Sequence, residues 1–152
     1  MPKAIVIYES MFGNTKRAAE TIIEGMKEAG VEAVLSTPKE LDEKQLADFD
    51  AIVVGSPTHM GSATRGIRKF IDRLGKLKLQ GKMVAFFDCH ASPEPGKAVG
   101  KMEKQLGEKA PGLKLASPGL SLMVDGMRGP LSEGELPKCK EFGLVIANQL
   151  QA

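Results

Sequence analysis

Tryptophan is absent from this chain of 152 residues, and tyrosine occurs only once. The two cysteines, Cys89 and Cys139, stand far apart, which excludes a disulfide framework and the paired spacing of a zinc site. No apolar run approaches the roughly 20 residues of a membrane-spanning helix, and no secretory signal precedes the first apolar segment. The net charge of +2 comes from interspersed lysines and acids, which gives no basic stripe for nucleic acid. We therefore expect a cytoplasmic protein that binds neither nucleic acid nor membranes.

The apolar residues alternate along the chain between short continuous runs and runs at helical spacing. Continuous runs are typical of parallel strands that are buried on both faces. The strict alternation predicts a single α/β domain over residues 1–152, with a five-stranded parallel sheet between helices. We expect strands over 3–8, 31–35, 51–55, 83–87 and 113–124, and helices over 15–29, within 38–49, and over 67–74, 98–106 and 136–150.

Three polar loops follow the first, third and fourth of these predicted strands, over residues 10–15, 56–62 and 88–96. In a doubly wound sheet the carboxyl ends of the strands meet at one edge, and ligands bind there. We therefore expect the three loops to form one binding site.

The first loop reads Ser10-Met11-Phe12-Gly13-Asn14-Thr15 and leads directly into a helical pattern. Hydroxyl and amide side chains, with backbone N–H groups at a helix N-terminus, suit a phosphate dianion. A plain turn with Asn14 or Thr15 as the helix cap is the alternative. The loop resembles the phosphate loop of the flavodoxin family. That resemblance implies a doubly wound sheet in the order 2-1-3-4-5 and one non-covalently bound FMN.

The second loop contains Pro57-Thr58-His59-Met60-Gly61 and is similar to the corresponding loop of flavodoxin-like quinone reductases. In the family this loop faces the flavin ring, and the resemblance implies that the peptide at Gly61 flips when the flavin is reduced. The alternative is a tight loop that only caps the next helix.

The third loop reads from Asp88-Cys89-His90 to Gly96 and lacks the tyrosine that flavodoxins place against the flavin, just as the second loop lacks their common tryptophan. His59, Met60 and His90 are the predicted replacements, although both histidines also fit ordinary surface positions. For Cys89 we favour a small buried residue over a reactive thiol. The predicted FMN-binding residues are Ser10, Met11, Phe12, Gly13, Asn14, Thr15, Pro57, Thr58, His59, Met60, Gly61, Asp88, Cys89, His90 and Gly96.

The resemblance implies a monomeric, low-potential one-electron carrier that exchanges electrons with redox partner proteins. The slightly basic charge differs from that of typical flavodoxins, which are strongly acidic. Two alternatives therefore stay open. One is an FMN-dependent NAD(P)H:quinone-type oxidoreductase, and the other is a flavin-free binding module on the same fold.

Overall fold

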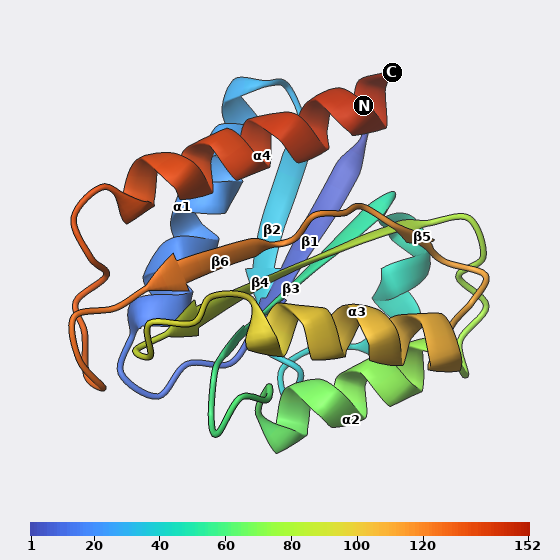
Figure 1. The fold of residues 1–152 in the computed structure, drawn as a ribbon. Coiled ribbons are helices and arrows are strands. Elements are labelled where there is room, and N and C mark those ends of the chain that lie inside the picture. The colour runs from blue at the N-terminus through green and yellow to red at the C-terminus, as the bar shows by residue number, and fades with distance from the viewer.

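The computed structural model describes residues 1–152 and contains one twisted sheet between two layers of helices (Figure 1). The strands are parallel and follow the order β2-β1-β3-β4-β5, and a further strand, β6, also pairs with β4. This arrangement confirms the predicted fold class and strand order. In chain order the elements are β1 (Lys3–Tyr8), α1 (Asn14–Glu28), β2 (Glu32–Ser36), the 3₁₀ helix η1 (Glu43–Asp48), β3 (Ala51–Pro57), α2 (Arg65–Leu74), β4 (Met83–His90), α3 (Lys97–Lys109), β5 (Lys114–Leu115), β6 (Leu120–Met123) and α4 (Glu135–Gln151).

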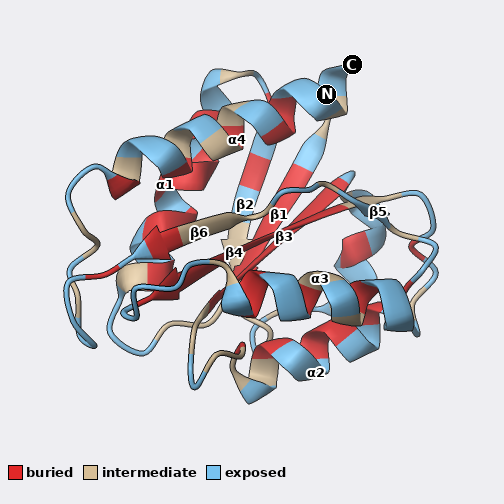
Figure 2. Ribbon diagram, in the orientation of Figure 1, coloured by how far each residue is buried: buried red, intermediate tan, exposed pale blue.

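The central strands are buried on both faces, as their continuous apolar runs predict (Figure 2). Alternate residues of β1 enter two separate hydrophobic cores. Val6 packs with α1 and α4 on one side of the sheet, and Ile7 packs with α2 and α3 on the other. Each helix buries one stripe of side chains, and none has the length and apolar character needed to cross a membrane.

Helices α1 and α4 approach each other closely because two glycines lie at their crossing. A Cβ atom built at Gly25 would lie 2.2 Å from the carbonyl oxygen of Lys140. One built at Gly143 would lie 2.1 Å from the carbonyl oxygen of Ile22. The contact is therefore backbone against backbone, and it fixes the position of α1, whose first residues carry the phosphate-type loop.

The region over 113–124 forms two short strands rather than the one strand that the sequence predicts. Strand β5 pairs with Met83 and Val84, at the beginning of β4. Strand β6 pairs with the last four residues of β4, from Phe87 to His90. Residues 116–119 separate them, and the two pieces share the edge position beside β4.

Strand β4 continues three residues beyond its predicted end at Phe87. Its neighbours support the extension, because Cys89 pairs with Pro57 of β3 and His90 pairs with Met123 of β6. The third loop therefore begins at Ala91 rather than at Asp88. This is a correction to the sequence-based boundary, which rested on the polar character of Asp88 and His90.

Candidate functional site

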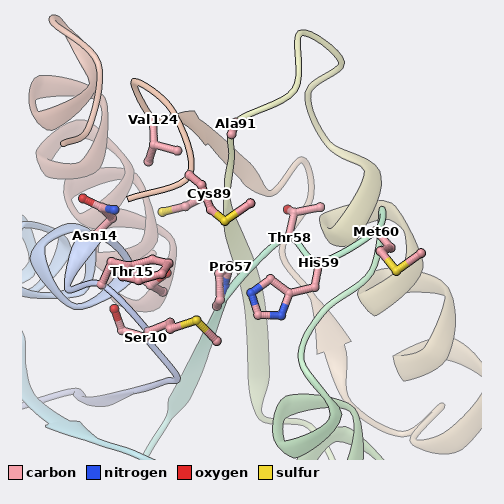
Figure 3. A pocket seen from close by; sticks show the side chains of 13 residues that line it. Ser10, Asn14, Thr15, Pro57, Thr58, His59, Met60, Cys89, Ala91 and Val124 are labelled. Carbon is pink, nitrogen blue, oxygen red and sulfur yellow. The ribbon is translucent and has the colours of Figure 1, made fainter. Parts of the chain in front are cut away.

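A cavity of about 320 Å³ opens at the carboxyl edge of the sheet, where the predicted site lies (Figure 3). Its walls come from the loops after β1, β3 and β4 and from the segment after β6. The lining residues are Ser10, Met11, Phe12, Asn14, Thr15, Pro57, Thr58, His59, Met60, Cys89, Ala91, Val124 and Met127.

The loop after β1 presents backbone N–H groups that the protein leaves without acceptors. Gly13 takes a left-handed conformation (φ 90°), and its N–H donates to Ser10 Oγ over 3.0 Å. The N–H groups of Met11, Phe12, Asn14, Thr15 and Lys16 have no acceptor within the protein, and the first N–H of α1 with a backbone acceptor is that of Arg17, which donates to the Gly13 carbonyl over 3.0 Å. Such a cluster at a helix N-terminus favours an anion. The alternative of a plain side-chain cap is wrong, because Gly13 is the cap residue and no side chain caps α1.

Thr15 and Cys89 form the floor of the cavity. Thr15 is buried, and its hydroxyl favours the ionised form of the Cys89 side chain. Burial nevertheless raises the pKa of Cys89 to about 12, so the side chain is an uncharged thiol at neutral pH. The structure thus agrees with the interpretation of Cys89 as a small buried residue.

The loop after β3 forms a two-residue hairpin turn between His59 and Ser62. The two residues exchange backbone hydrogen bonds of 2.8 and 3.0 Å. Met60 (φ 53°) and Gly61 (φ 79°) occupy the centre, which is the geometry of a type I′ turn. The N–H groups of Met60 and Gly61 have no acceptor within the protein. Lys101 of α3 holds the turn from outside, with Nζ 3.0 Å from Ser62 Oγ.

Side chains of this hairpin give the cavity its second wall. The His59 ring points into the group of lining residues, whereas Met60 lies at its margin (Figure 3). Thr58 donates its backbone N–H to the Cys89 carbonyl over 2.8 Å, but its buried hydroxyl has no partner. An orphaned buried hydroxyl costs free energy unless a ligand satisfies it. Together with the free N–H groups, it fits the polar periphery of a flavin nucleotide.

Three predicted site residues, Asp88, His90 and Gly96, do not line this cavity. Asp88 is fully buried in β4, and its carboxylate accepts from the Val99 N–H over 2.9 Å and from the Ser121 hydroxyl. Burial raises the pKa of Asp88, although these two bonds oppose the rise. Asp88 therefore anchors the start of α3.

His90 and Gly96 are likewise held by the protein itself. His90 is buried, with Nδ1 2.7 Å from the Ser92 carbonyl oxygen, and Gly96 donates its N–H to Ser121 Oγ over 2.8 Å. His90 therefore does not replace the missing tyrosine at the cavity. Two other predicted residues, Gly13 and Gly61, shape the lining loops through their positive φ angles without lining the cavity themselves.

The segment after β6 contributes a fourth loop that sequence reasoning missed. Val124 and Met127 line the cavity, and the Arg128 carbonyl accepts from Asn14 Nδ2 over 3.2 Å. The Arg128 guanidinium lies over the Phe12 ring, 5.7 Å from its centroid. Ligands of such sheets bind beside the carboxyl ends of the strands. A segment that directly follows a strand is therefore a candidate for the site, and this criterion could have indicated the segment after β6.

Comparison with known proteins identifies the fold and the family. The structure superposes on a flavodoxin from the domain Archaea with a TM-score of 0.86, at 29% identity over 99% of both chains. Oxidised flavodoxin 2 from Bacillus cereus gives a TM-score of 0.81, at 29% identity over 97% of this chain and 99% of that one. An NAD(P)H dehydrogenase (quinone) of Archaeoglobus fulgidus is 31% identical over 64% of this chain and 66% of its own length. The chain thus spans less than two thirds of that relative.

The flavodoxin domain model matches residues 5–119, and the chain belongs to the flavodoxin family, whose cofactor is FMN.

Proposed function

We propose that the cavity at the carboxyl edge binds FMN and that the protein serves as a one-electron carrier. The observation that carries this proposal is the cluster of unpartnered backbone N–H groups at the start of α1, which opens into the same cavity as the Thr58 hydroxyl. The loop from Ser10 to Thr15 would hold the phosphate. The segment over 57–61 and the wall formed by Cys89 and Val124 would hold the ring.

The lining residues support a carrier because they offer binding rather than acid–base chemistry. No carboxylate or lysine lines the cavity, and the Cys89 thiol is uncharged at neutral pH. His59 is the only lining side chain of a type that commonly acts as an acid or a base. When bound, FMN supplies the electron chemistry, while the protein orients it and excludes water from one side. The likeness to solved flavodoxins over nearly the whole of both chains also supports this function.

A second candidate is an NAD(P)H-dependent quinone reductase, which the similarity to a curated relative favours. The curated relative from Archaeoglobus fulgidus carries that name and exceeds 30% identity. Because this chain spans only about two thirds of the relative, a reductase activity needs direct evidence.

The FMN site is tested by comparing FMN with riboflavin, which lacks the phosphate. Ser10→Ala and Thr15→Ala remove hydroxyls from the proposed phosphate loop, and Thr58→Val removes the orphaned hydroxyl from the other wall. We expect the two loop variants to lose about tenfold or more in FMN affinity, with riboflavin affinity nearly unchanged. Thr58→Val serves as the matched control, because it lies away from the phosphate loop and changes both affinities alike. Flavin fluorescence quenching measures the dissociation constants. Equal losses for both ligands in the loop variants would refute the phosphate assignment.

The reaction is tested by stepwise anaerobic photoreduction of the FMN-loaded protein, followed in the visible spectrum. Reduction in two separate one-electron steps supports the carrier. A single two-electron step, together with NAD(P)H oxidation in the presence of a benzoquinone, supports the reductase. Failure to retain FMN contradicts both and leaves a flavin-free binding module.

A further inference from the structure

Exposed large apolar side chains are concentrated around the mouth of the candidate FMN cavity. Nine such side chains are exposed in the whole chain, and four of them line this cavity. They come from three separate loops, those after β1, β3 and β6. We call the four the apolar rim, and they are Met11, Phe12, Met60 and Met127.

The rim is made chiefly of methionines that project into solvent. Met127 is 80% exposed and Met11 is 66% exposed, while Met60 is fully exposed. Met60 is also the only residue other than glycine with a positive φ, so the hairpin holds it outward in a strained backbone conformation. Methionine adapts to irregular apolar surfaces, and clustered exposed apolar side chains mark interaction surfaces.

Cations without carboxylate partners flank the rim. The Lys101 Nζ atom is held by Ser62 and lies 3.6 Å from the Cβ position of Gly61, next to Met60. Arg128 covers the Phe12 ring. Lys16 lines the adjoining cavity, together with Met11. None of the three cations has a carboxylate within 4.0 Å.

Three acids lie in the same region, and only one of them is paired with a cation. Glu9 accepts a hydrogen bond from the Thr64 hydroxyl, at the start of α2. Asp125 accepts one from the Ser132 hydroxyl over 2.7 Å, and Glu94 is paired with Lys97 over 3.0 Å. Hydroxyl donors leave the charges of Glu9 and Asp125 in place, so the surface around the cavity mouth combines an apolar centre with three unpaired cations and two carboxylates that no cation pairs with.

We propose that the apolar rim docks an electron-transfer protein whose own docking surface is acidic around an apolar centre. This inference rests on the proposed function, because the rim surrounds the site where electrons would enter and leave. Complementary charge would speed the encounter, and the methionines would adapt to the apolar contact. Three cations on separate elements, namely Lys16 in α1, Lys101 in α3 and Arg128 in the loop after β6, fall short of the dense clusters of four to eight that bind anionic lipid, which favours a protein over a membrane.

The experiment measures electron transfer from the photoreduced, FMN-loaded protein to two haem proteins of opposite charge, cytochrome b5 (acidic) and cytochrome c (basic). Second-order rate constants are taken by stopped flow at several salt concentrations. We expect the rate to cytochrome b5 to fall as salt rises and the rate to cytochrome c to rise.

Two triple variants with the same change in charge locate the effect. Lys16→Gln, Lys101→Gln and Arg128→Gln together remove the rim cations. Lys78→Gln, Lys109→Gln and Lys114→Gln remove three exposed lysines near the opposite, amino edge of the sheet. In the variant without the rim cations (the rim triple), we expect the rate of electron transfer to cytochrome b5 at low salt to fall about tenfold or more and to depend no longer on salt. In the variant without the three distant lysines (the control triple), we expect that rate to change by less than about twofold. Met60→Ser with Met127→Ser should slow transfer at every salt concentration.

Equal effects of the two triples, or a rate to cytochrome b5 that rises with salt, would overturn the docking proposal while the FMN function stands. Loss of FMN retention or of photoreduction in the unmodified protein would overturn the proposed function and this inference with it. If the unmodified protein sediments with phosphatidylserine vesicles and the variant without the three rim cations does not, the surface binds a membrane, and the proposal of a protein partner is overturned. FMN dissociation constants of both triples are measured alongside, because a rim variant that only released FMN would also contradict docking.

Discussion

Replacing Gly143 by alanine should destabilise the protein, although alanine is the better helix former. The Cβ atom added in α4 would lie 2.1 Å from the Ile22 carbonyl oxygen of α1. A close carbon–oxygen contact needs roughly 3.3 Å, so the helices would have to separate by about 1 Å at their crossing. Neither partner can rotate away, because both are backbone.

The sign of the effect follows from two opposing magnitudes. Alanine gains about 1 kcal/mol over glycine inside a helix. Overpacking a closely packed contact costs about 1–3 kcal/mol, and here the separation also loosens the side chains on both sides of the crossing. We expect a net loss of about 1–2 kcal/mol in the free energy of unfolding. Gly100 of α3 provides the matched control, since a Cβ atom there meets nothing within 4 Å and Gly100→Ala should stabilise by up to about 1 kcal/mol.

Urea unfolding followed by far-ultraviolet circular dichroism measures both variants, since the chain has no tryptophan to report by fluorescence. The midpoint should fall for Gly143→Ala and rise for Gly100→Ala. Gly25→Ala probes the same crossing from α1, where its Cβ atom would lie 2.2 Å from the Lys140 carbonyl. We expect the two crossing variants to be non-additive when combined. A stabilised Gly143→Ala would show that the helices separate freely and would refute the reasoning.

Three further predictions concern the site and its supports. Met60→Asn should raise the free energy of unfolding by about 1 kcal/mol, because asparagine tolerates the left-handed conformation that the hairpin imposes; an unchanged urea midpoint would mean that Met60 is not strained. Cys89 should resist alkylation by iodoacetamide, because raising its pKa from 9.0 to about 12 lowers the thiolate fraction about a thousandfold; mass spectrometry should find it modified only after unfolding. The raised pKa of Asp88, caused mainly by burial, means that the folded protein binds that proton more tightly than the unfolded chain does. The unmodified protein should therefore lose stability relative to Asp88→Asn as pH rises from the ordinary value of 3.8 through the raised pKa, and a difference in urea midpoints that does not vary with pH would contradict this.

The candidate site was predictable wherever its residues follow one another along the chain. The loop from Ser10 to Thr15 lies between an apolar strand and an amphipathic helix, and those local patterns alone are enough to place it at the carboxyl edge of the sheet. The hairpin around Met60 and Gly61 was equally visible as a short polar segment after a buried strand.

The errors arose where a residue's environment comes from distant parts of the chain. Asp88 and His90 have the polarity of a loop, yet they belong to a strand because β3 and β6 flank them. Asp88 is tolerated there because Val99 and Ser121, 11 and 33 residues away, donate hydrogen bonds to its carboxylate. No local pattern indicates such partners.

The order of strands and helices, the family and the position of the phosphate-type loop can all be inferred from the amino-acid sequence, because periodic burial and turn chemistry act over a few neighbouring residues. What surrounds that loop depends instead on contacts between distant segments. Asn14 reaches the Arg128 carbonyl across 114 residues, and this contact brings the segment after β6 to the cavity. The apolar rim and the unpaired cations beside it exist for the same reason, since they come from loops and helices that are adjacent only once the parallel sheet has brought the ends of its strands together.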